Sequence, residues 1–204
     1  MLSMVIPAGE SGASMTDTDL MVRVKGGDES AFRLIVEKYQ RRVVNVAYRL
    51  LGNRDDAEEV AQETFLKAYM SAKSYTPKAE LFTYLYTIAT RLALNRLRKE
   101  RRFRWLSLDA SDENEGEMAP EPISNPSDRP DLSLEQAERD ALVRRAMDAL
   151  PAAQKAVLVF SRYEGLSYKE IADVMETSVS AVESKLHRAK QTLKKKLSTY
   201  LENF

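Results

Sequence analysis

Residues 167–189, SYKEIADVMETSVSAVESKLHRA, decide the fold of the second half of this 204-residue chain. Ser167 stands three positions before Glu170, which is the spacing of a capping box at the start of a helix. Apolar residues at helical spacing follow, as expected of a buried stripe: Ile171, Ala172 and Met175. The polar residues 176–178 are too few for anything but a turn, and the last of them, Ser178, is a good N-cap for a second helix. The stretch therefore predicts two helices joined by a tight turn.

The second predicted helix has two unlike faces. Its apolar face, expected to point inward, consists of Val179, Val182, Leu186 and Leu193. Its other face is small, polar and basic, and consists of Ser180, Ala181, Ser184, Lys185, His187 and Arg188. Small side chains at a helix start allow close approach to a DNA duplex, and basic ones behind them can reach phosphates. A helix-turn-helix that reads DNA explains this pattern. An ordinary helical hairpin with a solvated basic face explains it too, and Glu176 occupies a turn position where Gly is more usual.

The composition argues against several other kinds of site. The sequence has no Cys and one His, which excludes a disulfide framework and a Cys nucleophile and argues against a catalytic zinc centre. Gly26 and Gly27 end a helix and are not part of a Gly-rich phosphate loop. No run of eighteen apolar residues is present, so we expect no membrane span. We therefore expect no metal, no cofactor and no catalytic residue.

The net charge of zero conceals three segments of different charge. Residues 1–108 carry a net charge of +5, residues 109–131 carry −7 and residues 132–204 carry +2. The middle segment also holds four Pro and almost no apolar residue, a composition that cannot bury enough surface to fold by itself. We therefore predict an all-α chain of two small helical domains, at 16–106 and 132–204, joined by a flexible acidic linker at 107–131. Residues 1–15 are expected to form a disordered tail.

Three helices are predicted in the first 70 residues. The first two run from Thr16 to Lys25 and from the N-cap Asp28 to Gly52, and a capping box of Asp55 and Glu58 is expected to begin the third. The inward stripe of the third helix consists of Ala57, Val60, Ala61, Thr64, Phe65 and Ala68. The side chains left outside are mostly acidic: Glu58, Glu59, Gln62, Glu63 and Leu66. A solvated helix face is the simpler interpretation of that pattern, and a docking face for a basic partner helix is the other.

The helix predicted from residue 80 onward combines aromatic rings with a basic run. Its buried seam is expected at Leu81, Leu85, Ile88, Ala89 and Leu92. Seven of the fourteen residues 91–104 are basic, and a separate polar stripe consists of Thr87, Arg91, Asn95, Arg98 and Arg102. Aromatic residues stand at or just before its start: Tyr75, Phe82, Tyr84 and Tyr86. A single DNA strand needs rings that stack on its bases and cations that follow its backbone. Core packing is the alternative for the rings, and we expect at least two of the four in the core.

Taken in order, these segments resemble the extracytoplasmic-function sigma factors of bacterial RNA polymerase, which have only the second and fourth sigma regions. The resemblance covers about residues 16–202. It rests on four segments in the family's order: GDESAFRLIVEKY (27–39), DDAEEVAQETFLKAY (55–69), FTYLYTIATRLALNRLRKERR (82–102) and ALPAAQKAVLVFSRYEGLSYKEIADVMETSVSAVESKLHRAK (149–190). The resemblance implies a promoter-specificity subunit that is not itself an enzyme and that is cytoplasmic, or membrane-associated when a membrane anti-sigma factor holds it.

The resemblance also implies roles for the residues above. The acidic face of Glu59, Gln62, Glu63 and Leu66 would dock on the clamp helices of the largest polymerase subunit, so the resemblance favours docking over solvation. The polymerase flap is a further implied contact. The rings of Tyr75, Phe82, Tyr84 and Tyr86 would help to capture an unstacked base of the −10 element. Its phosphates and bases would be contacted by Arg91, Asn95, Arg98, Lys99, Arg101 and Arg102. The −35 duplex would be read and clamped by Ser180, Ala181, Ser184, Lys185 and Arg188. An anti-sigma factor is an implied partner, because relatives are commonly held inactive by one.

Two positions depart from the family's pattern. Tyr84 stands where many members carry Trp. Glu183 stands at a recognition-helix position that is often basic, where a carboxylate would either accept from a cytosine amino group or face away from DNA. Two other functions stay open. A helix-turn-helix repressor or activator that acts without polymerase leaves the acidic face unexplained, and a helical nuclease needs a metal or acid–base cluster that the sequence does not supply.

Overall fold

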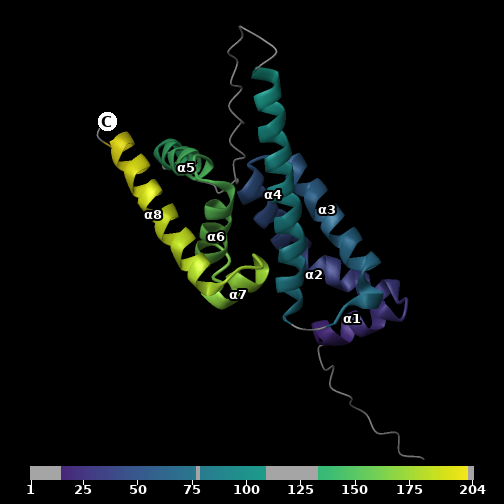
Figure 1. The fold of residues 1–204 in the computed structure, drawn as a ribbon. Coiled ribbons are helices and arrows are strands. Elements are labelled where there is room, and N and C mark those ends of the chain that lie inside the picture. The colour runs from purple at the N-terminus through teal and green to yellow at the C-terminus, as the bar shows by residue number, and fades with distance from the viewer. Residues whose placement is uncertain (1–14, 77–78, 109–132, 202–204) are drawn as a thin grey trace, which may run out of the picture.

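The computed structural model describes residues 15–76, 79–108 and 133–201, and every regular element within these ranges is a helix. The first body contains α1 (Asp17–Lys25), α2 (Glu29–Leu51), α3 (Arg54–Met70), the short 3-10 helix η1 (Ala72–Ser74) and α4 (Leu81–Leu108). The second contains α5 (Ser133–Asp148), α6 (Ala152–Arg162), α7 (Tyr168–Val174) and α8 (Val179–Leu201). The prediction of an all-α chain with two helical domains is confirmed (Figure 1). Residues 1–14 of the predicted tail and 109–131 of the predicted linker lie outside the described residues.

Polar caps determine where the helices of the first body begin. The Asp28 carboxylate accepts hydrogen bonds from the backbone N–H groups of Ser30 and Ala31, as predicted for the start of α2. The Ser30 hydroxyl, which donates to the same carboxylate at 2.5 Å, and next the Ala31 N–H stabilise its charged form, so the pKa of Asp28 lies well below its usual value. Unsatisfied N–H groups at a helix start would otherwise destabilise the first turn.

The predicted capping box of Asp55 and Glu58 is wrong. Asn53 caps α3 instead, with its side-chain oxygen accepting from the N–H of Asp56 at 3.1 Å. Because α2 ends at Leu51 and Gly52 turns the chain in a left-handed conformation, Asn53 is the first available N-cap residue and begins α3. Glu58 therefore lies inside α3, where it forms an ion pair with Arg54 at 2.8 Å.

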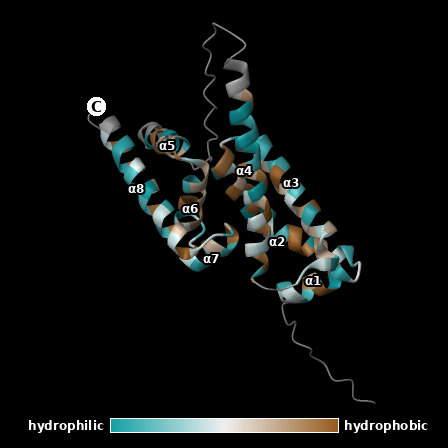
Figure 2. Cartoon of the chain, in the orientation of Figure 1, coloured by the Kyte–Doolittle hydropathy of each residue, from teal (hydrophilic) through white to brown (hydrophobic). Residues whose placement is uncertain are grey.

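The inward stripes predicted for the first body form its core. All six residues of the α3 stripe are buried: Ala57, Val60, Ala61, Thr64, Phe65 and Ala68. In the α4 seam, Leu81, Leu85 and Ala89 are buried, while Ile88 and Leu92 are half-buried against the same core. Burial of one large apolar side chain contributes about 1.5–3 kcal/mol, so these stripes hold α2, α3 and α4 together. Hydrophobic residues face the inside of this body, whereas the far half of α4 is mostly hydrophilic (Figure 2).

Helices α7 and α8 form the predicted helix-turn-helix. Ser167 and Glu170 make a reciprocal capping box, whose hydrogen bonds lower the pKa of Glu170. The Ser178 hydroxyl accepts from the N–H of Ala181 at the start of α8, at 3.2 Å. Between the helices, Glu176 has φ +49, a left-handed conformation that L side chains adopt at a cost. The turn therefore has the geometry that usually selects Gly, but carries a charged residue.

One residue of the apolar face predicted for α8 does not point inward. Val179 is 41% exposed, whereas Val182 and Leu186 are buried and Leu193 is half-buried. Side chains on a helix lean toward its N-terminus. Since Val179 is the first residue of α8, its side chain extends past the helix start rather than onto the core.

The two bodies pack against each other. Helix α6 contacts α2 and α4, and α7 contacts α4, while α5 and α8 lie on the side of the second body away from α4 (Figure 1). Buried apolar side chains of both bodies form one continuous cluster. Within the described ranges, no helix combines the length and apolar character needed to cross a membrane.

Candidate functional site

The acidic face predicted on α3 is exposed. Glu59, Gln62 and Glu63 are exposed, and 57% of the surface of Leu66 is exposed. The inward stripe lies on the opposite side of the same helix, so these four side chains share the outward face. Lys67 lies 3.3 Å from the Glu63 carboxylate. An exposed acidic face with an apolar side chain at one end is complementary to an amphipathic basic helix.

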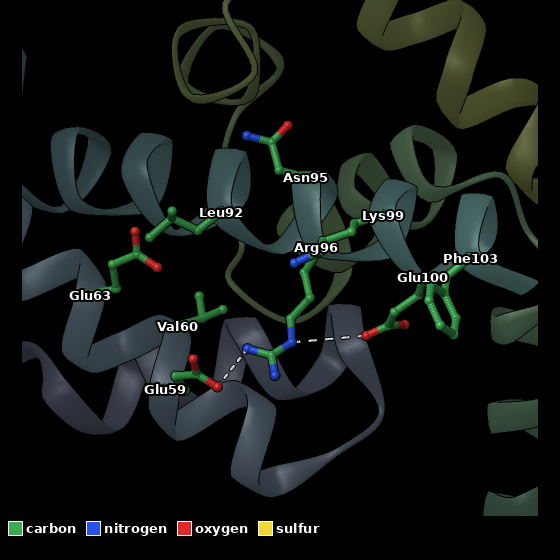
Figure 3. A pocket seen from close by; sticks show the side chains of 9 residues that line it. All are labelled: Glu59, Val60, Glu63, Leu92, Asn95, Arg96, Lys99, Glu100 and Phe103. Carbon is green, nitrogen blue, oxygen red and sulfur yellow. Dashed lines mark hydrogen bonds and ion pairs between the residues drawn. The ribbon is translucent and has the colours of Figure 1, made fainter.

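An open groove of about 710 Å³ runs between α3 and α4 beside this face (Figure 3). Its lining residues are Glu59, Val60, Glu63, Leu92, Asn95, Arg96, Lys99, Glu100 and Phe103. Two sets of predicted site residues therefore meet here, the acidic ones on α3 and the polar and basic ones on α4.

Arg96 joins the two walls of this groove. Its guanidinium donates to Glu59 at 2.7 Å, pairs with Asp56 and lies 3.8 Å from Glu100. The hydrogen bond to Glu59, followed by the charges of Asp56, Glu59 and Glu100, raises the pKa of Arg96. Arg96 therefore ties α4 to α3, and it fixes the position of Glu59 within the acidic face.

The four aromatic rings predicted near the start of α4 lie in two contacting pairs. The ring centroids of Tyr75 and Tyr84 are 5.0 Å apart, and those of Phe82 and Tyr86 are 5.9 Å apart. The Tyr84 hydroxyl is hydrogen-bonded to that of Ser71 at 2.5 Å. Tyr86 is fully buried, and the other three rings are half-buried against the core. Only Tyr86 belongs to the buried core, so the expectation of at least two core rings is met by one ring; the other three pack against the core.

Residues 91–102 of α4 present a row of exposed, mostly basic side chains. Arg91, Asn95, Arg98, Lys99, Arg101 and Arg102 are all exposed. The Arg98 guanidinium donates to the Asn95 side chain at 3.1 Å, so these two side chains lie next to each other. Because α4 is one uninterrupted helix, the ring cluster and this basic segment are rigidly connected.

The residues predicted to face DNA on α8 share one face. Ser180, Ser184 and Arg188 are exposed, and Ala181 and Lys185 are partly exposed. Their three- and four-residue steps place them together, opposite the buried Val182 and Leu186. The small residues lie in the first turns of α8 and the basic ones behind them.

Three charged residues at the contact between the bodies were not predicted as functional. They are Lys155 on α6, Glu164 in the loop before α7, and Glu176 in the turn before α8. Lys155 is 6% exposed and donates to the Leu50 carbonyl at 2.8 Å and to the Asp148 carboxylate at 2.7 Å. A Lys directly before the apolar run AVLVF (156–160) of α6 is a sequence signal of a buried partner. The two Glu residues stand in turns, where acidic residues are common and carry no such signal.

Comparison with known proteins identifies both bodies. Residues 35–103 match the family "Sigma-70 region 2" and residues 140–193 match "Sigma-70, region 4". The chain is 34% identical to the RNA polymerase sigma-H factor of Pseudomonas aeruginosa over 188 residues, which are 91% of this chain and 95% of that protein. It is 31% identical to the ECF RNA polymerase sigma factor SigW of Bacillus subtilis over 175 residues, 86% of this chain and 93% of that one.

A solved structure shows the same fold. It is that of the sigma factor RpoE of Bartonella quintana in complex with the anti-sigma factor NepR, with 21% sequence identity and a TM-score of 0.59 over 82% of this chain and 96% of that one. The two matched regions, in this order on two helical bodies, define a sigma factor of the sigma-70 superfamily. This chain belongs to the extracytoplasmic-function (ECF) RNA polymerase sigma factors.

Proposed function

We propose that this chain directs core RNA polymerase to specific promoters through three surfaces, one each on α3, α4 and α8. The first is the acidic face of Glu59, Gln62, Glu63 and Leu66. It docks on a basic helical element of the polymerase core, for which the clamp helices of the largest subunit are the partner that the family resemblance implies. Exposure of all four side chains on one helix face supports this assignment. The neighbouring ion pairs of Arg96 hold Glu59 in a fixed position for that contact.

The second surface opens and holds the −10 element. Half-buried rings of Tyr75, Phe82 and Tyr84, with Tyr86 behind them, accept an unstacked base, since base–aromatic stacking contributes about 1–3 kcal/mol per base. Phosphates and bases of the same strand contact Arg91, Asn95, Arg98, Lys99, Arg101 and Arg102. The observation that carries the proposal is that one rigid helix, α4, carries three of the rings, Phe82, Tyr84 and Tyr86, and the exposed cations in succession. Strand separation then draws on binding energy alone.

The third surface reads the −35 duplex. Ser180, Ala181 and Ser184 bring the start of α8 close to base edges in the major groove, while Lys185 and Arg188 contact phosphates. Residues 16–106 and 132–204 thus act as two promoter-binding domains, and the acidic segment between them tethers the two. The protein acts without catalysing a reaction, in the cytoplasm where polymerase and promoter meet. An anti-sigma factor is the expected regulatory partner.

Transcription with purified components tests this function. Core polymerase with this protein should initiate at promoters of the source bacterium that core polymerase alone does not use. Combined Arg98→Ala and Lys99→Ala replacements should abolish opening of the −10 segment, followed by 2-aminopurine fluorescence, while leaving binding to core polymerase intact. Combined Lys25→Ala and Arg33→Ala replacements, at exposed positions of α1 and α2, are the matched control for loss of two basic residues. The absence of promoter-specific initiation on every genomic target would exclude the sigma-factor function.

A further inference from the structure

The contact between the two bodies has an aromatic centre. The Tyr86 ring on α4 packs against the Phe160 ring on α6, with centroids 5.6 Å apart, and neither side chain is exposed. Tyr86 is also one of the rings assigned above to the −10 element. In this arrangement the Tyr86 ring is fully buried, with Phe160 of the second body packed against it, so no base can reach it.

Glu164 makes polar contacts with the Tyr86 hydroxyl and with two arginines of the first body. Its carboxylate accepts a hydrogen bond from the Tyr86 hydroxyl at 2.6 Å and lies 3.8 Å and 3.9 Å from the guanidinium nitrogens of Arg42 and Arg49. Only 9% of its side chain is exposed. A carboxylate so far from water is stable only because cations and a donor surround it. All three partners belong to the first body, whereas Glu164 belongs to the second.

Glu176 makes a second contact of the same kind. Its carboxylate pairs with the Arg91 guanidinium, with Nε 2.9 Å from the nearer oxygen. Glu176 is also the only non-glycine residue with positive φ in the part of the chain that the structure describes. A charged residue at a position where the backbone favours Gly suggests that its side chain makes a contact important for function. Pairing with Arg91, a residue assigned above to DNA, is the contact that this side chain makes.

We propose that the free protein adopts a closed conformation in which the second body covers the −10-binding surface of the first. In this conformation Glu164 binds Tyr86 and Glu176 binds Arg91, two residues that single-stranded DNA would contact. This inference rests on the proposed function of α4. The Glu176 carboxylate takes the place of a DNA phosphate beside Arg91, while Glu164, held by Arg42 and Arg49, binds the hydroxyl of the Tyr86 ring. The bodies must separate before Tyr86 accepts a base. Polymerase and promoter therefore bind the open form, and closure lowers their apparent affinity by the fraction of molecules that is open.

Distance measurement on the free protein tests closure directly. Because the sequence has no Cys, spin labels can be placed at single introduced cysteines, Lys25→Cys on α1 and Lys190→Cys on α8, both exposed. At low salt the unaltered interface should give one narrow distance distribution. Glu164→Gln with Glu176→Gln should give a broad distribution at longer distances. The matched control, Asp140→Asn with Asp173→Asn, removes two exposed carboxylates from the same body and should keep the narrow distribution.

A charge exchange separates the ion pair from other effects of the substitutions. Arg91→Glu alone should broaden the distance distribution, and Arg91→Glu with Glu176→Arg should narrow it again. Circular dichroism of each variant verifies that the helices remain folded. A broad distribution in the unaltered protein, or a distribution that the Glu164 and Glu176 variants leave unchanged, would overturn closure.

Binding of single-stranded DNA tests whether closure masks the surface. A fluorescent oligonucleotide with the −10 sequence should bind the Glu164→Gln, Glu176→Gln variant at least about five-fold more tightly than the unaltered protein, because a larger fraction is open. The affinity of the Asp140→Asn, Asp173→Asn control should differ from that of the unaltered protein by less than about two-fold. This difference measures the effect of the lost negative charge alone. Separation of the bodies with no gain in DNA affinity would overturn masking. The label distances involve neither DNA nor polymerase, so failure of the transcription assay would count against the proposed function and not against closure.

Discussion

Tyr86 lies between the Phe160 ring and the Glu164 carboxylate. Burial, and next the hydrogen bond to Glu164, raise the pKa of this phenol well above its usual value of 10.0. The folded protein thus favours the neutral phenol more strongly than the unfolded chain does. By linkage, the stabilisation that this preference provides is complete below pH 10 and is lost as the pH rises from there toward the folded pKa.

Replacement of Tyr86 by Phe should remove this pH dependence. The free energies of unfolding of the unaltered protein and of Tyr86→Phe should differ at pH 8 and converge as the pH rises above 10. Urea unfolding at a series of pH values measures both curves. For Tyr168→Phe, which alters a 40% exposed tyrosine, the curve of unfolding free energy against pH should run parallel to that of the unaltered protein at every pH. Parallel curves for Tyr86→Phe would mean that the Tyr86–Glu164 hydrogen bond does not form in solution.

At the scale of helices, α3 separates two tasks on opposite faces. Its inward face is buried and its outward face carries Glu59, Gln62, Glu63 and Leu66. Glu63→Lys should therefore weaken binding to core polymerase by about 1–2 kcal/mol, since a like charge now faces a basic partner. It should change the free energy of unfolding by only a few tenths of a kcal/mol, through repulsion with Lys67 one turn away.

Fluorescence anisotropy with labelled core polymerase measures this loss. The control is Glu37→Lys, an equal charge reversal at an exposed position of α2, which should bind core normally. Equal affinities of the Glu63 and Glu37 variants would exclude the α3 face as the docking surface.

Helix α8 makes a similar division between a buried face and a DNA face. Arg188→Ala should weaken binding to the −35 duplex to a similar degree for every sequence, because a phosphate contact carries no sequence information. It should also flatten the slope of log affinity against log salt by about 0.9, the value for one lost phosphate contact. Titrations at several salt concentrations, with Lys190→Ala as the control on another side of α8, give both quantities. A loss of specificity at one base pair would instead identify Arg188 as a base reader.

At the scale of the whole molecule, Lys155 connects the two bodies. Its ammonium donates to the Leu50 carbonyl in the last turn of α2 and to Asp148 at the end of α5. Lys155→Met keeps the apolar stem but leaves the buried carbonyl without this donor. The free energy of unfolding should fall by about 1–3 kcal/mol. Lys169→Met, at an exposed position of α7, should change the free energy of unfolding by less than about 0.5 kcal/mol. Calorimetry compares the two, and equal stabilities would show that the contact contributes nothing.

Local geometry explains what the sequence could predict. All six α3 stripe residues follow from helical period alone, and the Ser167 capping box from a three-residue spacing. The start of α3 could not be located in the same way, because the polar run NRDDAEE offers several N-cap candidates and only the end of α2 selects Asn53. The sequence also could not distinguish Tyr86, which is fully buried, from the three half-buried rings. Its burial depends on Phe160 and Glu164, more than 70 positions away in the chain.

Because α4 is uninterrupted, it tolerates some kinds of sequence change better than others. Each residue of an α-helix advances the angular phase by about 100°, so the buried seam in the first half of α4 sets the direction in which Arg98 and its neighbours project. Substitutions in the second half alter one side chain at a time. A single-residue insertion just after Ala93 would leave the seam packed and yet rotate every later cation by more than a quarter of a circle. Length in this helix is therefore constrained more strictly than composition, and natural variation here should consist of exchanges rather than insertions or deletions.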